Sequence, residues 1–158
     1  MSMLHVVVSA VVDASAEAVY DVFSDYEVAH KAILPKPYFE DMVILAGGRG
    51  EGTVVDVYMK VLGVKKTYHL TVTEPKPGRL LVETDYNTGE RTHFIMEPLA
   101  NGRQTRVTLD SKFNTSPGFA GSIERMITGP ITRYIYKKEL ANLAAYLAEK
   151  ENNVALAQ

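Results

Sequence analysis

Six segments between Phe39 and Asn114 alternate apolar and polar side chains, and short sequences rich in glycine, asparagine or proline separate them. A period of two is typical of strands, because successive side chains of a strand point to opposite faces of a sheet. Links this short join antiparallel neighbours, whereas parallel strands need a crossover of a dozen or more residues. The sequence therefore predicts an antiparallel meander, with strands at 39–46, 52–62, 64–74, 79–86, 91–99 and 104–114.

Shorter elements are expected before the meander. The valine-rich run 4–12 is predicted to form a seventh strand. Ser15 is a good helix-capping residue, and apolar side chains then repeat at helical spacing over 17–25. A second short helix over 26–34 is expected to stop at Pro35, since proline cannot continue a helix.

A long C-terminal helix is predicted over 117–150, where apolar residues form a stripe at helical spacing. At 1.5 Å per residue such a helix would be about 50 Å long. The tail 151–158 has no stripe and is expected to be frayed. No linker or internal repeat divides the chain. We therefore expect a single domain over residues 1–150 of the α+β class, with a seven-stranded antiparallel sheet, two short helices and the long helix.

Four stretches carry a more specific pattern. Residues 8–20 contain a strand that ends in Asp-Ala-Ser before a helix, 25–27 read Asp-Tyr-Glu, 50–54 read Gly-Glu-Gly-Thr-Val, and 74–80 read Glu-Pro-Lys-Pro-Gly-Arg-Leu. In this order the chain resembles the START-related superfamily called SRPBCC, which includes polyketide cyclase and lipid-transport domains. Ser15 stands where many members carry proline, and a hydroxyl cap serves the same helix start.

This resemblance covers about the first 150 residues and implies the helix-grip fold. In that fold a curved sheet wraps around the last helix and encloses an elongated hydrophobic cavity. The resemblance does not select one reaction, because members include ligand carriers and cyclases.

Composition excludes several classes of partner. The net charge of −2 gives no reason to expect a nucleic acid or an anionic membrane surface. The chain has no cysteine, which removes disulfides, thiolate nucleophiles and cysteine-ligated metals. The apolar run 6–12 is far shorter than the roughly 20 residues of a spanning helix, and nothing basic precedes it. We therefore expect a cytoplasmic protein without stable membrane insertion and without a cofactor, whose partner is a hydrophobic small molecule.

Alternation along the strands nominates the cavity wall. The inward side chains are predicted to be aliphatic and aromatic with a few hydroxyls, which suits an apolar molecule carrying one or two oxygens. Glu83 and Asp85 are expected on the wet face of their strand. The predicted ligand-binding residues are Val57, Met59, Tyr68, Leu70, Val82, Thr84, Tyr86, Phe94, Met96, Leu109, Ser111 and Phe113 from the sheet, and Phe119, Ile123, Met126, Ile127 and Tyr134 from the long helix.

No catalytic signature stands out. Tyr68 or Tyr86 would be the proton donor of an enzyme, unless its hydroxyl only satisfies a backbone partner. The four histidines have no metal-ligand spacing and are expected to be solvated, so no metal site is predicted. His30 is the one to watch, because it lies near the expected cavity mouth. The histidines are His5, His30, His69 and His93.

Two features of the long helix remain open at this point. Gly129-Pro130 should kink or break the helix, either as the hinge of a lid or as a fixed bend. Basic residues such as Arg133 and Lys137 alternate with acidic ones such as Glu139, which indicates a solvated face rather than an anion site.

The sequence supports three hypotheses for function. The preferred one is a non-enzymatic binder or carrier of a hydrophobic small molecule that is lipid-, polyketide- or aromatic-like. The second is an enzyme of the polyketide cyclase or isomerase type, and the third is a protein-interaction module that uses the same groove. A charged or imidazole group pointing into the cavity would favour the enzyme, and a wall of hydroxyls the carrier.

Overall fold

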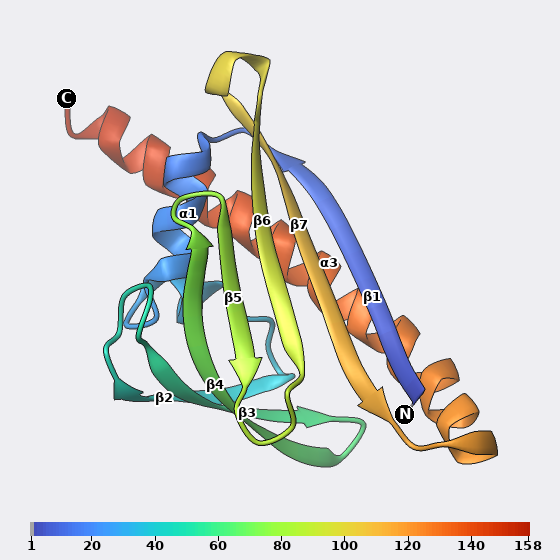
Figure 1. Ribbon diagram of the computed structural model, residues 1–158. Helices are drawn as coiled ribbons and strands as arrows, with labels where there is room; N and C mark the ends of the chain where they lie inside the picture. Colours follow the sequence, from blue (N-terminus) through green and yellow to red (C-terminus); the bar gives the residue numbers. More distant parts are fainter. Residues whose placement is uncertain (1) are drawn as a thin grey trace.

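A computed structural model describes residues 2–158, and its element order is the predicted one (Figure 1). Seven strands and three α-helices are joined by short connections, with one short 3₁₀ turn at Ala100–Gly102. The elements are β1 (Ser2–Val12), α1 (Ala16–Ser24), α2 (Ala29–Ile33), β2 (Phe39–Ala46), β3 (Val54–Val61), β4 (Val64–Lys76), β5 (Leu80–Asp85), β6 (Arg91–Leu99), β7 (Gln104–Thr115) and α3 (Gly118–Leu156).

The seven strands form one antiparallel sheet in the order β1-β7-β6-β5-β4-β3-β2. The meander from β2 to β7 is therefore continuous. At its end β1 forms the edge strand and pairs with β7 over its whole length, from Ser2 opposite Thr115 to Val12 opposite Thr105. The sheet is curved, and α3 lies along its concave face (Figure 1). This is the helix-grip arrangement that the sequence predicted.

Local sequence explains how the short helices begin. The Ser15 hydroxyl accepts a hydrogen bond from the Ala18 N–H at 3.1 Å and so caps α1. The carboxylate of Asp25 accepts hydrogen bonds from the backbone N–H groups of Val28 and Ala29, at the start of α2. The Asp25 carbonyl also accepts the His30 N–H at 2.8 Å. Asp25 therefore fixes the segment that carries His30.

The long helix differs from its prediction in two respects. It continues to Leu156, six residues beyond the expected end at Lys150, so the segment 151–156 is helical rather than frayed. It also runs through Pro130 without a break. A proline removes its own N–H donor, and the hydrogen bonds of the neighbouring turns keep the 39-residue helix continuous despite that lost bond.

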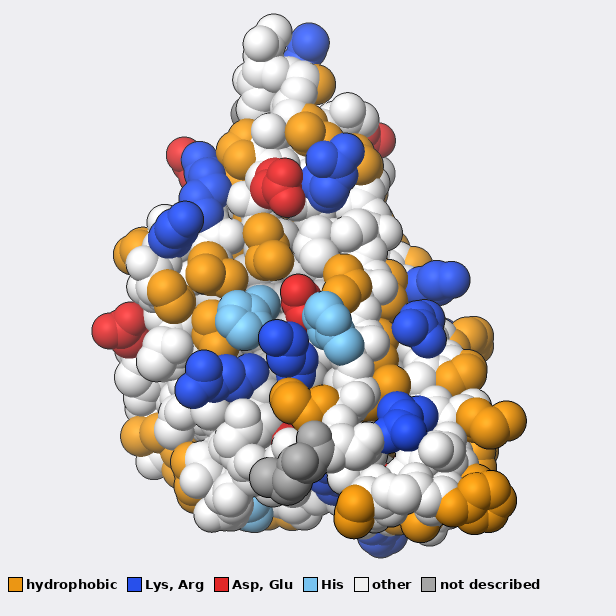
Figure 2. Space-filling view, turned by 45° about the vertical axis from the view of Figure 1, so that its right-hand side comes forward, with side chains coloured by type: hydrophobic (Ala, Val, Ile, Leu, Met, Phe, Trp, Pro, Cys, Tyr) orange, Lys and Arg blue, Asp and Glu red, His pale blue; other side chains and the backbone are white. Residues whose placement is uncertain are grey.

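The packed core fills one end of the space between sheet and helix. Leu140, Leu143 and Leu147 of α3 are buried against α1, whose Val19 and Phe23 are fully buried. The outer face of the sheet mixes charged and hydrophobic side chains (Figure 2). His5 Nε2 lies 2.7 Å from Asp110 Oδ1 there. The other half of α3 does not complete the core, and a cavity lies beneath it.

Candidate active site

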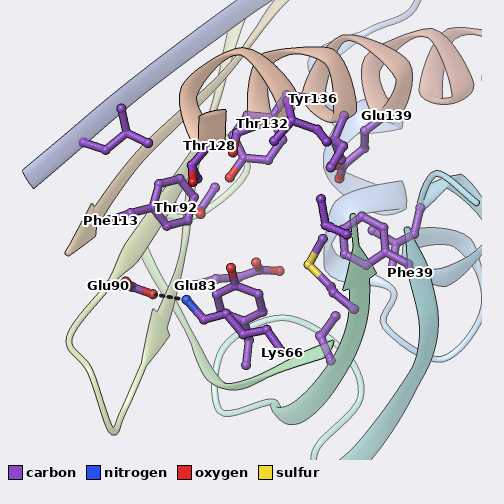
Figure 3. Close-up of a pocket in the computed structure, with 18 of the residues that line it drawn as sticks. Phe39, Lys66, Glu83, Glu90, Thr92, Phe113, Thr128, Thr132, Tyr136 and Glu139 are labelled. Carbon is purple, nitrogen blue, oxygen red and sulfur yellow. Dashed lines mark hydrogen bonds and ion pairs between the residues drawn. The ribbon is translucent and has the colours of Figure 1, made fainter. Parts of the chain in front are cut away.

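The cavity has a volume of about 530 Å³ and lies between the inner face of the sheet and residues 124–139 of α3. This volume is typical of sites for small organic molecules. Most of its wall is apolar, with side chains from β2, β3, β4 and β6 facing those of the helix (Figure 3). The apolar lining includes Leu34, Phe39, Met42, Val57, Met59, Leu70, Phe94, Phe113, Ile127, Ile131 and Ile135.

Ten of the predicted ligand-binding residues face inward, and they fall into two groups. Those that line the cavity are Val57, Met59, Tyr68, Leu70, Phe94, Phe113 and Ile127. Met96, Leu109 and Ser111 face inward as predicted but are fully buried in the wall behind the lining.

The prediction for β5 was wrong, because its two faces were exchanged. Val82, Thr84 and Tyr86 lie on the outer side, and the Tyr86 ring packs 5.7 Å from the ring of His69 there. Apolar residues occupy both faces of β5, so alternation alone did not determine which face is inward. Pairing decides it: Glu83 lies opposite Thr92, whose side chain lines the cavity, so Glu83 points inward as well.

The predicted face of α3 was also partly wrong. Phe119, Met126 and Tyr134 are 82%, 77% and 53% exposed, and Ile123 is exposed as well. The helix has apolar residues on two faces, and Met126 precedes the lining residue Ile127 by one position, which is about 100° around the helix. At about 100° per residue, Phe119 and Met126 lie on the side of α3 turned away from the lining residues. Ile123 and Tyr134 lie at the edge of the lining face, where the Tyr134 ring centre is 6.1 Å from that of Tyr38. Hydrophobic side chains gather at this end of the molecule (Figure 2).

A buried acid–base pair lies at the inner end of the cavity. His30 of α2 and Glu139 of α3 are 2% and 3% exposed, and His30 Nε2 is 3.7 Å from Glu139 Oε1. His30 Nδ1 lies 2.7 Å from the Phe23 carbonyl oxygen, which can only accept, so Nδ1 carries a proton. Nε2 is then the atom that gains or loses a proton next to Glu139. Both the surface location predicted for His30 and the solvated face predicted for Glu139 were wrong.

A second carboxylate joins this pair from the sheet. Glu83 Oε1 accepts a hydrogen bond from the Tyr26 hydroxyl at 2.8 Å, and Tyr26 is itself buried. Glu83 and Glu139 reach the cavity from opposite sides, one from β5 and one from α3 (Figure 3). Tyr26, His30, Glu83 and Glu139 are called the acid–base cluster below.

Burial and mutual charge set the proton affinities of the cluster. Desolvation by burial raises the pKa of Glu83, although the nearby His30 and the Tyr26 hydrogen bond act in the opposite direction. Burial alone would lower the pKa of His30, but the interaction with the Glu139 carboxylate and the charge of Glu83 outweigh it and leave that pKa raised. Burial and Glu83 raise the pKa of Tyr26 well above its usual value, so Tyr26 stays a neutral donor.

The aromatic surroundings hold the imidazole in place. The His30 ring centre lies 5.6 Å from Phe23, 4.7 Å from Tyr26 and 5.6 Å from Phe94. Asn142 of α3 donates a hydrogen bond to the Ile33 carbonyl at 3.0 Å and ties α2 to the helix that carries Glu139. The groups of the cluster therefore come from three elements but are held by packed contacts.

A charged pair lies at the outer end of the cavity. Lys66 Nζ is 3.3 Å from Glu90 Oε2 and 4.4 Å from the centre of the Tyr68 ring. The other oxygen of Glu90 accepts the Asn114 N–H at 3.0 Å. Lys66 is about half exposed, so this pair marks the side that opens to solvent. The ring of Tyr68, a residue considered as a proton donor from the sequence, therefore contacts the ammonium group of Lys66.

Three hydroxyl groups form a chain along the wall between these two ends. Thr92 Oγ1 lies 2.6 Å from Ser111 Oγ, and Ser111 Oγ lies 2.6 Å from the Tyr136 hydroxyl. Thr92 and Tyr136 line the cavity, and Ser111 is fully buried behind them. Thr128 and Thr132 place two further hydroxyl-bearing side chains on the helix side (Figure 3).

Sequence signals for the missed charged residues existed. Glu139 stands in a row of residues four apart with Ile131, Ile135, Leu143 and Leu147, which places it on the buried stripe of α3. Lys66 shares the strand parity of Tyr68 and Leu70. For His30 the only sequence signal was its place near the expected cavity mouth. Nothing in the sequence distinguishes a buried His30 from a solvated one.

Two absences concern the described part of the chain, residues 2–158. It contains no group of three or more metal-ligating side chains that could hold a metal ion. None of its helices is both long enough and apolar enough to cross a bilayer.

Comparison with known proteins places this architecture in a family. Residues 3–148 match the family described as "Polyketide cyclase / dehydrase and lipid transport", and the chain belongs to that family. No curated protein matches the sequence.

Solved structures share the fold at low identity. The KanY protein is 23% identical with a TM-score of 0.81, covering 94% of this chain and 99% of that one. A START superfamily protein from Mycobacterium smegmatis is 20% identical with a TM-score of 0.64, covering 95% and 98%. The ZhuI aromatase/cyclase from Streptomyces sp. R1128 is 21% identical with a TM-score of 0.64, covering 97% and 96%. At these identities the likeness concerns the fold.

Proposed function

We propose that this protein is an enzyme that binds an apolar, aromatic- or polyketide-like molecule in its cavity and moves a proton to or from one of its carbons. The observation that carries the proposal is the acid–base cluster at the inner end of a cavity whose wall is otherwise mostly apolar. The ZhuI aromatase/cyclase and the cyclase members of the family are consistent with this activity. We place the enzyme in the cytoplasm, in keeping with the lack of cysteine.

Glu83 is the group we assign as the general base. Its Oε1 is held by the Tyr26 hydroxyl, and its side chain lines the cavity. The desolvation that raises its pKa also makes its carboxylate a stronger base than one in water. The His30–Glu139 pair holds a second proton at Nε2 that can be returned to the product.

The same cluster argues against a simple carrier. A carrier needs an apolar wall with a few hydroxyls to orient its cargo, and burying two carboxylates and an imidazole adds a desolvation cost that binding alone does not require. Groups with shifted pKa values in a cavity are a frequent mark of catalytic sites. The preference for a carrier drawn from the sequence therefore gives way to the enzyme.

Deuterium exchange tests the proposal without knowledge of the natural substrate. 2-Tetralone is a bicyclic apolar ketone with acidic α-hydrogens, and ¹H NMR follows their replacement by deuterium in D₂O. We expect the protein to accelerate this exchange in proportion to its concentration. Glu83→Gln keeps the Tyr26 hydrogen bond but removes the base, and should lower the rate by about 10²–10⁴. Glu149→Gln, exposed and far along α3, is the matched control and should leave it unchanged.

Two results would count against the proposal. One is binding of 2-tetralone with no acceleration above buffer, which is the behaviour of a carrier. The other is acceleration that Glu83→Gln and Glu149→Gln leave equally intact, which would place the base elsewhere.

A further inference from the structure

We propose that the hydroxyl chain Thr92–Ser111–Tyr136 is a binding subsite for the carbonyl oxygen of the substrate, with Tyr136 as its direct donor. This inference rests on the proposed function, because it assigns the substrate class, an enolisable apolar ketone, to the same cavity. Nothing in the family match or in the acid–base cluster identifies these three residues.

The first argument is a count of hydroxyl protons. Each of the three hydroxyls carries one hydrogen, and the chain contains two hydrogen bonds, from Thr92 to Ser111 and from Ser111 to Tyr136 in either direction. One hydrogen is therefore left over. When Ser111 donates to one neighbour and accepts from the other, the spare hydrogen is on Thr92 or Tyr136, and both line the cavity. The short contacts of both hydroxyls, at 2.6 Å, are to Ser111.

The second argument is the position of this donor relative to Glu83. Glu83 pairs with Thr92 across β5 and β6, and Thr92 pairs with Ser111 across β6 and β7. The three side chains form a row on the inner face, and directly opposed residues of antiparallel strands have Cβ atoms about 5 Å apart. Tyr136 reaches this row from α3, so its hydroxyl and Glu83 enter the cavity from opposite walls (Figure 3).

This spacing fits removal of a proton next to a carbonyl group. With the carbonyl oxygen about 3 Å from the donor, the α-carbon lies between the donor and the carboxylate. The Glu83 carboxylate takes the α-proton, the C–H electron pair becomes the new C=C bond, and the carbonyl π pair moves to oxygen. The resulting enolate oxygen accepts the hydrogen bond of Tyr136. When Glu83 returns a proton to the carbon, the oxygen pair re-forms the C=O bond and the C=C pair forms the new C–H bond, which regenerates the ketone and the carboxylate.

The Tyr136 hydroxyl keeps its hydrogen at neutral pH. Burial raises its pKa well above the ordinary value, and the neighbouring hydroxyls of Ser111 and Thr92 only partly offset this effect. Tyr136 therefore acts as a neutral donor, and Ser111 aligns it without meeting the substrate.

The experiment compares 2-tetralone with tetralin, the same skeleton without the oxygen. Affinities are measured by displacement of the neutral fluorophore N-phenyl-1-naphthylamine. We expect the wild type to prefer the ketone, and Tyr136→Phe to reduce that preference by about 2- to 12-fold, the net effect of one hydrogen bond. The exchange rate of bound 2-tetralone should fall about 10²–10³-fold, as for loss of an oxyanion donor. Thr92→Val and Ser111→Ala should give smaller losses in both assays.

The controls separate this inference from the proposed function. Tyr146→Phe removes a hydroxyl outside the cavity and should change neither value. Glu83→Gln should lower the exchange rate by about 10²–10⁴ but keep the ketone preference. A ketone preference that Tyr136→Phe removes supports the subsite even if the wild type catalyses no exchange. Equal preference and equal exchange in wild type, Tyr136→Phe and Thr92→Val, with melting temperatures showing folded variants, would overturn it while leaving Glu83 as the base.

Discussion

The charges around the cavity should make it select against anions. Four carboxylates line the cavity, those of Glu83, Glu90, Glu124 and Glu139, and face two cations, Lys66 and His30, so the fully ionised cavity carries two net negative charges. The raised pKa of His30 favours its protonated form beside Glu139. A bound anion has no unpaired cation to meet, because Lys66 already lies 3.3 Å from Glu90.

The size of the effect follows from the size of the cavity. A sphere of 530 Å³ is about 10 Å across, so a ligand charge lies within about 10 Å of every group on the wall. At an effective dielectric constant of about 20, one unit charge at that distance contributes about 1.7 kcal/mol, or about 15-fold in affinity. Removing the Glu83 charge should therefore raise the affinity for an anion relative to its neutral analogue by about 15-fold.

The assay uses two fluorophores that differ by one sulfonate group, N-phenyl-1-naphthylamine and 1-anilinonaphthalene-8-sulfonate, titrated at pH 8, well above the ordinary pKa of a glutamate. We expect the wild type to bind the neutral probe more tightly. Glu83→Gln should lower the Kd of the anionic probe divided by the Kd of the neutral probe by about 15-fold. Glu149→Gln makes the same change in net charge outside the cavity and should leave the ratio unchanged. A ratio that moves less than twofold in Glu83→Gln would refute this electrostatic account.

The remaining predictions concern stability, pH and motion. Leu109→Ala removes a fully buried side chain and should lower the free energy of unfolding by about 2–5 kcal/mol in urea titrations, whereas Leu62→Ala, 71% exposed, should change it by less than about 0.5 kcal/mol. Both Glu83 and His30 have raised pKa values, so the folded state binds protons more tightly than the unfolded chain. The free energy of unfolding should therefore fall as pH rises above about 4.5 for Glu83 and above about 6.5 for His30. Urea titrations from pH 5 to 8 should show a shallower fall in Glu83→Gln than in the wild type. If residues 117–130 act as a lid, N-phenyl-1-naphthylamine should slow their hydrogen exchange, and equal protection with and without the probe would favour a fixed helix.

The sequence was sufficient for the fold because its turns are explicit. The strands 39–46 and 91–99 have the predicted bounds, and glycine or asparagine with positive φ occupies the turns that follow them, as at Gly47 and Asn101. Such positions fix where one strand ends and the next begins. The pairing order then follows, since short links leave antiparallel neighbours no other arrangement.

The site was harder to predict because its decisive residues violate the pattern that located the wall. The parity rule assumes that charged side chains face water, and Glu83 and Glu139 face the cavity. Where β5 offered apolar residues on both faces, the assumption selected the wrong face. The register of β5 against β6 resolves the choice, but pairing depends on contacts across the whole sheet rather than on β5 itself.

The cost of the acid–base cluster supplies an argument for its role. Replacing buried charged groups by apolar ones of similar volume is often neutral or stabilising by about 1–4 kcal/mol, so Glu139 and His30 do not owe their place to stability. The packed leucines of α3 beyond Glu139, from Leu140 to Leu147, already hold the helix on the sheet. The chain instead places Glu139 one turn after Tyr136, and Glu83 one strand away from Thr92. A carboxylate and a hydroxyl thus lie side by side on both walls of one cavity, an arrangement that apolar packing does not need and that the proposed chemistry on a carbonyl compound does.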